Sequence, residues 1–418
     1  MEQIFYPSRF QGSTGAMASK SYLQRALMIA SLSKGTSTLS NVLWSDDALA
    51  VRRIIESLGA EIQGNEEISI SPGERLPRKA LQFNVGESGL ALNIFSSLSS
   101  IYSGPITMQG EGTLLKRSID SLVGNLRALD IQIETNGRHL PITLTGPMKG
   151  DHAIIDCQSG SQLLSGLLMS LPLRTRNTTL EVLNLTSKPY IDMTLSIMRD
   201  FGITLQHEDY RVFCIEGQQS YHGTQYAIEG DWSAMANWMV GAAISGEVTI
   251  TGMDEESAQA DRAILEALKD FGAQIMIDQD QITIKKTSCR PFVFDATHCP
   301  DLFPPLTVLA ASCIGTSEIK GIHRLLNKES NRLESLIREF TILGLDISSI
   351  DDRLIIRGKG FLTGGRIHSH SDHRIAMAGA ISAAISTDPI EIRHIEAVSK
   401  SYPKFIKDIA RITHPIRK

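Results

Sequence analysis

A short segment recurs about every 71 residues along this chain of 418 residues. Each copy runs from an apolar residue through glycine or aspartate into alternating apolar and polar residues, which is typical of a helix end leading into a strand. The five clear copies are 71, 72, 70 and 72 residues apart, and they begin at Leu58, Leu129, Phe201, Phe271 and Leu343. A fixed period of this kind predicts an array of similar supersecondary units.

Each copy is preceded by two helical stretches and followed by a hairpin, as around Asn136-Gly137. The first helices are expected to begin near Ser19, Ser88, Ser161, Ser233, Asp301 and Asp372. The second helices are expected near Asp46, Arg117, Tyr190, Asp261, Arg332 and Tyr402, with Asp46 and Asp261 as N-caps. These series predict six units. The sixth has no room for a hairpin, so we expect an N-terminal strand, Glu2 to Tyr6, to complete it.

Completion of the sixth unit by the N-terminal strand predicts an α/β protein of two domains with three units each. Units one to three would form residues 13–229, and units four to six would form residues 1–12 plus 230–418. The chain would cross between the domains near Gly12 and Gly230. A length of 418 residues also exceeds what a single hydrophobic core usually supports.

Composition and charge argue against several classes of protein. The net charge is −5 and no Lys/Arg run is present, so a nucleic-acid partner is not expected. We see neither a signal peptide nor an apolar stretch of the roughly 18 residues needed to span a membrane. The five cysteines are scattered without a Cys-x-x-Cys pair, which indicates reduced thiols and a cytoplasmic location.

Several expected helix starts carry cations or hydroxyl groups, which an anionic ligand requires. The N-terminus of a helix offers unpaired N–H groups and the positive end of the helix dipole. The stretches are Ser19-Lys20-Ser21 with Arg25, Ser161-Gln162, Ser187-Lys188-Pro189-Tyr190, Lys328 to Arg332, Asp372-His373-Arg374, and Lys400. One such cation is more often a solvated surface charge. Basic residues in a first turn oppose the dipole, however, so their recurrence favours a site for an anion with several charges.

Two carboxylates and one histidine-rich stretch leave alternatives open. Asp301 is either a helix cap or a catalytic group, and Glu329 lies among cations, where burial beside a substrate would raise its pKa. His368, His370 and Asp372 would share one face of a strand, as metal ligands do. No other Cys/His cluster completes such a site, so we favour a loop of hydrogen-bonding side chains. No Walker loop or dinucleotide fingerprint is present.

These residues resemble the enolpyruvyl transferases, and within them the branch that uses shikimate 3-phosphate. The motifs that carry the resemblance follow the family's order along nearly the whole chain, including Asp372-His373-Arg374-Ile375-Ala376-Met377. The resemblance implies a two-domain inverse α/β barrel with six βαβαββ repeats, three in each domain, and an active site in the cleft between the domains. It also implies a cytoplasmic monomer that joins phosphoenolpyruvate to the 5-hydroxyl of shikimate 3-phosphate and releases phosphate, without metal or other cofactor.

The resemblance also implies the roles of individual residues. Phosphoenolpyruvate would contact Lys20, Gly89, Arg117, Gln162, Arg332, Arg374 and Lys400. Shikimate 3-phosphate would contact Lys20, Ser21, Arg25, Ser161, Gln162, Ser187, Tyr190, Asp301 and Lys328. Catalysis would use Lys20, Asp301, which takes the hydroxyl proton, and Glu329, which protonates the methylene carbon.

Five positions depart from the family pattern. Asn93 replaces a common arginine, Glu87 an asparagine, Gly160 a serine, Asn331 an aspartate, and Ser118 a proline. These changes reduce the number of contacts expected with the phosphate and carboxylate groups of the ligands. Two alternatives therefore stay open: the branch of the family that uses UDP-N-acetylglucosamine, and a relative that binds ligands without catalysis.

Overall fold

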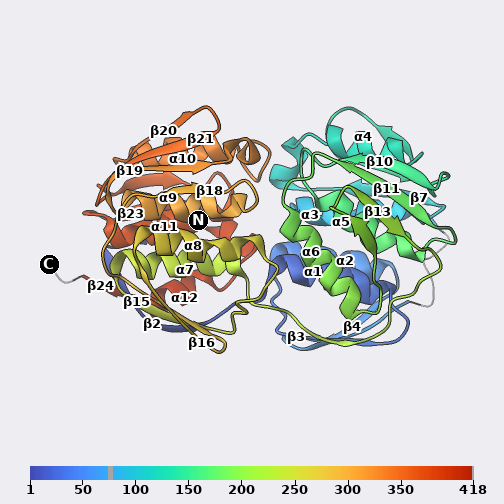
Figure 1. Cartoon of the computed structure of the whole chain (residues 1–418), viewed down its shortest axis with the longest axis horizontal. Coiled ribbons are helices and arrows are strands. Elements are labelled where there is room, and N and C mark those ends of the chain that lie inside the picture. Colours follow the sequence, from blue (N-terminus) through green and yellow to red (C-terminus); the bar gives the residue numbers. More distant parts are fainter. Residues whose placement is uncertain (74–78, 417–418) are drawn as a thin grey trace. The chain divides into compact units, whose positions relative to one another are not determined.

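The computed structural model of the protein describes residues 1–73 and 79–416, which belong to two compact units (Figure 1). One unit is Ala18–Ile228, and the other combines Met1–Met17 with Glu229–Lys418. The first crossing therefore follows Met17, five residues after the predicted boundary. The reason is strand β2 (Ser8–Gly15), which runs through that boundary and pairs in parallel with β15 (Glu247–Thr251) of the second unit.

The unit Ala18–Ile228 contains three four-stranded sheets, each built from a parallel pair followed by an antiparallel hairpin. Their strand orders are β14-β3-β5-β4, β6-β7-β9-β8 and β10-β11-β13-β12. The strands are β3 (Ser37–Ser40), β4 (Glu61–Gly64), β5 (Ile68–Ser71), β6 (Leu81–Asn84), β7 (Pro105–Gln109), β8 (Gln132–Thr135), β9 (Ile142–Thr145), β10 (His152–Asp156), β11 (Thr178–Leu183), β12 (Gln206–Glu208), β13 (Val212–Ile215) and β14 (Gln225–Ala227). The α-helices are α1 (Lys20–Leu32), α2 (Asp46–Ser57), α3 (Gly89–Ser96), α4 (Asp120–Ala128), α5 (Gln162–Ser170) and α6 (Lys188–Asp200).

The second unit repeats this plan with sheets β16-β17-β15-β2-β24, β18-β19-β21-β20 and β1-β23-β22. Its remaining strands are β1 (Glu2–Phe5), β16 (Gln274–Asp278), β17 (Gln281–Lys285), β18 (Val293–Asp295), β19 (Ile314–Lys320), β20 (Asp346–Ile350), β21 (Arg353–Lys359), β22 (Gly365–His368), β23 (Ile390–Arg393) and β24 (Thr413–Pro415). The α-helices are α7 (Trp232–Ser245), α8 (Ile264–Phe271), α9 (Phe303–Ala311), α10 (Arg332–Ile342), α11 (His373–Ser382) and α12 (Phe405–Ile412).

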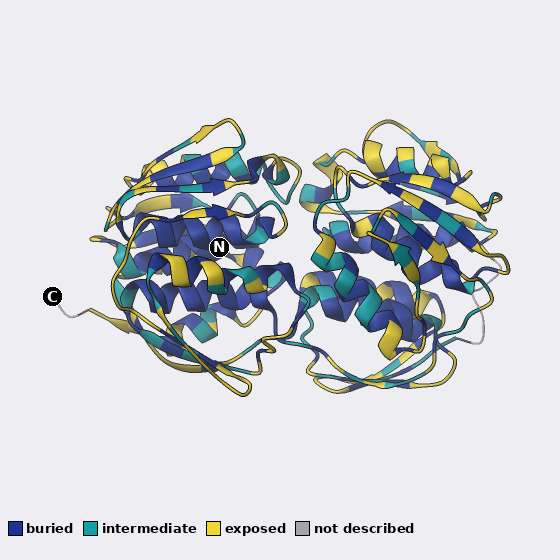
Figure 2. Cartoon of the chain, viewed as in Figure 1, coloured by how far each residue is buried: buried dark blue, intermediate teal, exposed yellow. Residues whose placement is uncertain are grey.

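Helices occupy the interior of each unit and sheets cover the outside (Figure 2). Every residue of α9 and α11 is buried, and both helices pack against each other and against α7. In the other unit, α3 packs against both α1 and α5. The strands instead alternate buried and exposed residues, as in β6 and β10, because only one face of each sheet meets the helices. This arrangement is the inverse of an ordinary α/β barrel.

The N-terminal strand completes the sixth repeat, as the repeat count predicts. Strand β1 pairs antiparallel with β23, from Glu2 opposite Arg393 to Phe5 opposite Ile390. It takes the place that a hairpin strand takes in the other repeats. The N-terminal ammonium also lies 2.6 Å from Oε2 of Glu396.

The expected helix starts are largely confirmed, but two of the expected caps are wrong. Asp46 is the first residue of α2, and the N-cap is Ser45, whose side chain accepts from the N–H of Ala48. Asp261 lies inside a 3-10 helix (Ala260–Ala263) that precedes α8. The second helix of repeat two also begins at Asp120 rather than Arg117.

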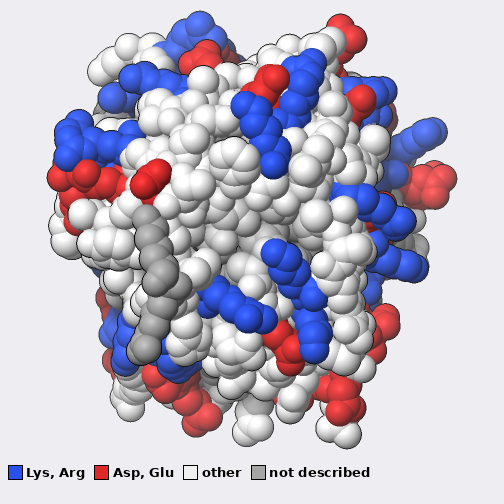
Figure 3. Space-filling view, turned by 90° about the vertical axis from the view of Figure 1, so that its left-hand side faces the viewer, with Lys and Arg blue, Asp and Glu red and all other residues white. Residues whose placement is uncertain are grey.

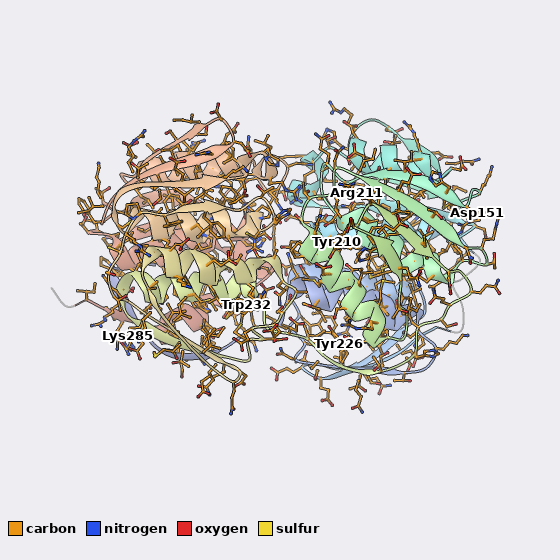
Figure 4. The ribbon with its side chains drawn as sticks, viewed as in Figure 1. Asp151, Tyr210, Arg211, Tyr226, Trp232 and Lys285 are labelled. Atoms are coloured by element: carbon orange, nitrogen blue, oxygen red, sulfur yellow. The ribbon has the colours of Figure 1, made fainter. Side chains whose placement is uncertain are left out.

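The surface carries interspersed charges of both signs, as the face in Figure 3 shows. Many form exposed ion pairs between neighbouring strands, such as Lys285 (labelled in Figure 4) with Glu247 at 3.0 Å. Such pairs stabilise a fold by only about 0–1 kcal/mol each. Within residues 1–73 and 79–416, the helices are too short or too polar for any of them to cross a membrane.

Candidate active site

Most of the ligand-binding residues predicted for Ala18–Ile228 lie at the N-termini of α1, α3, α5 and α6. Lys20, Gly89 and Gln162 are the first residues of α1, α3 and α5. Side chains join these helix starts. Asn93 Nδ2 donates to Gln162 Oε1 at 3.2 Å, and Ser88 Oγ contacts the Gln24 amide oxygen at 3.3 Å. The fold thus brings helix N-termini from three repeats together.

Arg25 is buried at the centre of this set. Its Nε donates to Thr194 Oγ1 at 2.9 Å, its Nη1 to the Ser21 carbonyl at 3.0 Å, and its Nη2 to Ser165 Oγ at 3.3 Å and the Tyr190 carbonyl at 3.5 Å. Burial lowers the pKa of Arg25 to about 10. The guanidinium therefore fixes the positions of α1, α5 and α6 relative to one another. It also orients the backbone of Ser21 and Tyr190, two other predicted ligand residues.

Ser187 and Tyr190 flank the start of α6. Ser187 is buried and has a left-handed backbone with φ of 59°. Lys188, beside them, lies with its ammonium 5.3 Å from the centre of the Tyr210 ring. Tyr210 is labelled in Figure 4, and its hydroxyl donates to Asp192 at 2.5 Å. Lys188 therefore packs against its own unit. Ser161, like Ser187, directly precedes its helix, α5, and is buried.

Lys20 and Arg117 differ in how their charged groups are paired. Lys20 Nζ forms an ion pair of 2.8 Å with Asp47 of α2, and both side chains are mostly buried. Arg117 follows the 3-10 helix Gly112–Lys116. Its Nε and Nη2 are buried and have no hydrogen-bond partner among the residues that the structure describes. A Cβ added to Gly89 would lie 3.0 Å from Arg117 Nη1, so this guanidinium faces the start of α3.

Arg332 organises the charged cluster of the second unit. Its side chain is fully buried and binds three carboxylates: Asp372 through Nε at 2.9 Å, Asp301 through Nη1 at 2.8 Å and Glu329 through Nη2 at 2.6 Å. Arg332 begins α10, and Asp372 caps α11 by accepting from the N–H of Arg374. The cluster thus joins the helix starts of two successive repeats.

The Asp301 carboxylate forms ion pairs with three cationic side chains. Arg374 Nη2 lies 2.8 Å from its Oδ2, while Arg332 Nη1 at 2.8 Å and Lys328 Nζ at 3.8 Å approach Oδ1. Burial alone would raise the pKa of Asp301, but Arg374, Lys328 and Arg332 hold it well below its ordinary value. Burial lowers the pKa of Lys328 despite these carboxylates. Asp301 is therefore ionised at neutral pH, as an acceptor of protons must be.

Arg374 and Lys400 are also anchored within the second unit. Arg374 Nη2 donates to Ser233 Oγ at 2.9 Å, next to the start of α7. Lys400 Nζ donates to the Ser371 carbonyl at 2.7 Å, one residue before the cap of α11. Three basic side chains, those of Lys328, Arg332 and Arg374, and three carboxylates thus converge on helix starts of repeats four to six, with Lys400 beside them.

The sequence as a whole matches a known family. A family model described as EPSP synthase (3-phosphoshikimate 1-carboxyvinyltransferase) matches residues 5–409. The chain belongs to the EPSP synthase family. A Clostridium kluyveri protein named 3-phosphoshikimate 1-carboxyvinyltransferase is 36% identical over 404 residues, which cover 96% of this chain and 95% of that protein. A Methanocorpusculum labreanum protein of the same name is 32% identical over 423 residues, covering 100% of each.

A solved structure has the same fold. EPSP synthase from Acinetobacter baumannii gives a TM-score of 0.83 at 27% identity and covers 100% of this chain and 99% of that one. The α/β fold that the sequence predicts is therefore confirmed for this EPSP synthase family member. The family match also favours the shikimate 3-phosphate branch over the UDP-sugar branch.

The departures from the family pattern have local structural roles. Asn93 Nδ2 donates to the Gly89 carbonyl at 2.8 Å as well as to Gln162. Asn331 caps α10 by accepting from the N–H of Glu334, and Ser118 accepts from the N–H of Asp120. Gly160 has φ of 141°, so a serine there would have space but a strained backbone.

The histidine-rich stretch forms a hydrogen-bonded loop. Buried Glu339 of α10 pairs with His370 Nε2 at 2.6 Å and accepts from the N–H of His368 at 2.8 Å. His368 Nδ1 in turn accepts from the N–H of His370 at 2.7 Å. In the described part of the chain, no group of three or more His, Cys, Asp or Glu side chains is arranged to hold a metal ion.

Sequence reasoning missed the contacts that four side chains make with residues of the candidate stretches. These are Asp47 beside Lys20, Ser233 beside Arg374, Asp372 beside Arg332, and Glu339 beneath the histidine loop. The repeat pattern could have indicated Ser233 and Asp372, because both occupy helix starts equivalent to that of Lys20. Asp47 and Glu339 lie within helices, where nothing in the repeat pattern distinguishes them.

Proposed function

We propose that the protein transfers the enolpyruvyl group of phosphoenolpyruvate to the 5-hydroxyl of shikimate 3-phosphate, giving 5-enolpyruvylshikimate 3-phosphate and phosphate. The observation that carries the proposal is the cluster of Asp301, Glu329, Arg332 and Arg374 in a member of the EPSP synthase family. The cluster combines two carboxylates for proton transfer with cations for a phosphorylated donor.

The cations suit the two anionic substrates. Phosphoenolpyruvate would be held by Lys20, Gly89, Arg117, Gln162, Arg332, Arg374 and Lys400. Shikimate 3-phosphate would be held by Lys20, Ser21, Arg25, Ser161, Gln162, Ser187, Tyr190, Asp301 and Lys328. Arg25 is buried and bonded within its own unit, so its contribution is mainly to orient Ser21 and Tyr190. Both sets draw on both units, so the proposed reaction requires both units to act on the same pair of substrates.

The reaction is an addition followed by an elimination. Glu329 would protonate the methylene carbon of phosphoenolpyruvate, which makes the adjacent carbon electrophilic. Asp301 would accept the proton of the 5-hydroxyl as its oxygen attacks that carbon. The tetrahedral intermediate then expels phosphate, and one proton of the methyl group formed in the first step returns to the Glu329 carboxylate as the double bond reforms. Cations such as Lys20 and Arg332 stabilise the departing phosphate.

Protein cations supply the charge stabilisation that this chemistry needs, so we propose a reaction without metal or other cofactor. We also propose a monomer in the cytoplasm, where its five free cysteines would remain reduced.

An assay of phosphate release tests the function. Purified protein should release phosphate only when phosphoenolpyruvate and shikimate 3-phosphate are both present, and an Asp301→Asn preparation should release little. Turnover with UDP-N-acetylglucosamine in place of shikimate 3-phosphate would refute the proposed acceptor. Binding of both substrates without turnover would identify a non-catalytic relative.

A further inference from the structure

Two loops that carry predicted donor-binding residues are joined to each other. One loop, residues 85–88, leads into α3 and Gly89. The other contains the 3-10 helix Gly112–Lys116 and ends at Arg117. Their backbones meet where the N–H of Glu111 donates to the Gly86 carbonyl at 2.7 Å. Contacts between these loops therefore decide where Arg117 lies relative to Gly89.

The side chain of Glu87 makes the strongest of these contacts. Its Oε2 accepts from both the N–H of Thr113 at 2.7 Å and the Thr113 hydroxyl at 2.6 Å. Thr113 is the second residue of the 3-10 helix, so the carboxylate satisfies an N–H that the helix itself leaves unpaired. A negative charge at this end of a helix is also favourable.

Gly112 provides the space for this contact. A Cβ added to Gly112 would lie only 2.4 Å from Cδ of Glu87, and the residue has a left-handed φ of 51°. Close approach of the carboxylate and the backbone conformation thus both require glycine. At the other end of the segment, the Arg117 carbonyl lies 3.0 Å from His139 Nδ1. The segment that carries Arg117 is therefore held at both ends.

The Glu87 carboxylate fixes the loop through Thr113, while the buried Nε and Nη2 of Arg117 have no hydrogen-bond partner within residues 1–73 and 79–416. Arg117 Nη1 instead faces the start of α3 beside Gly89. This geometry suits an anion that binds between the helix start and the guanidinium.

We propose that Glu87 is a positioning residue for phosphoenolpyruvate, which acts by holding the Arg117 segment against the start of α3. Glutamate replaces the asparagine common in the family at this position, and its longer side chain reaches the 3-10 helix. The inference rests on the proposed contact between Arg117 and phosphoenolpyruvate.

Steady-state kinetics of three variants test the proposal. Glu87→Ala removes both hydrogen bonds and should lower kcat/KM for phosphoenolpyruvate by roughly tenfold, the effect of losing a charge-assisted hydrogen bond. The KM for shikimate 3-phosphate should change by less than about twofold. Glu87→Gln should stay close to wild type, because a single amide oxygen can accept both bonds. Thr113→Val loses only the hydroxyl bond, so it should fall between these two variants and also serves if Glu87→Ala folds poorly.

A matched control and a double mutant separate positioning from general stability. Glu111→Ala removes a contact of 2.7 Å with Asn84 Nδ2 at the same junction and should leave kcat/KM within about twofold of wild type. In an Arg117→Ala background, adding Glu87→Ala should lower kcat/KM for phosphoenolpyruvate no further, because the effect of Glu87 depends on Arg117. Additive losses, or equal losses for both substrates, would overturn the inference. If Arg117→Ala itself leaves kcat/KM for phosphoenolpyruvate unchanged, the proposed donor contact fails instead.

Discussion

Replacing Asp372 by asparagine tests how the buried charges around Arg332 stabilise the second unit. Both side chains have no exposed surface, and Asp372 contacts Arg332 Nε at 2.9 Å and Nη2 at 3.3 Å. Asp372 Oδ1 also accepts from the N–H of Arg374 at 2.9 Å, which caps α11. Asparagine keeps an oxygen for the cap but presents an uncharged group to the arginine.

The expected cost follows from what remains around Arg332. Removing one partner of a buried ion pair costs about 3–5 kcal/mol of unfolding free energy. Asp301 at 2.8 Å and Glu329 at 2.6 Å still neutralise the guanidinium, so we expect the lower end, about 3 kcal/mol. Asp372→Ala also loses the cap, which adds about 1 kcal/mol. For a unit of this size, 3 kcal/mol corresponds to a fall in Tm of roughly 6–12 °C.

Tryptophan fluorescence during urea unfolding measures this cost. The chain has three tryptophans, and a Trp44→Phe background leaves Trp232 and Trp238, both in α7 of the second unit. Asp346→Asn is a matched control, because Asp346 pairs with Arg357 at 3.2 Å on the exposed surface. It should cost less than about 1 kcal/mol. The reasoning is refuted if Asp372→Asn is no more destabilising than Asp346→Asn.

Two further predictions concern carboxylates of the same unit. Asp301→Asn and Glu329→Gln should each lower turnover by roughly 100-fold or more while substrate binding changes less, as single-turnover kinetics and binding titrations would show; near-normal turnover would remove the residue from the mechanism. Burial alone would raise the pKa of Glu339, but the His370 side chain and the backbone N–H of His368 hold it below its ordinary value. Glu339 therefore stabilises the fold above a pH of about 4, and this stability is lost as the pH falls through the lowered pKa. In an acid titration, Glu339→Gln should unfold with a shallower pH dependence than wild type; an unchanged profile would contradict this role.

The repeat pattern predicts more of the fold than of the site. Helix starts recur with the period, so the positions of Lys20, Arg332 and Arg374 at those starts follow from the sequence. Their partners do not, because partners depend on which face of a helix turns inward. Arg25 lies only five residues beyond Lys20, yet it is buried and binds Thr194, whose sequence distance is 169 residues. No local pattern indicates such a contact.

In the proposed reaction, the charge balance of the second unit's cluster would link substrate binding to proton transfer. In the second unit, Lys328, Arg332 and Arg374 are already paired with Asp301, Glu329 and Asp372, so an anionic substrate must compete with protein carboxylates for these cations. Asp301 has a low pKa because of those cations, and a group with a low pKa is a weak base. A phosphorylated substrate that draws Arg332 and Arg374 toward itself would weaken their hold on Asp301 and raise its pKa. Asp301 would then become a stronger base toward the 5-hydroxyl of shikimate 3-phosphate only when phosphoenolpyruvate, the reaction partner of that hydroxyl, is bound.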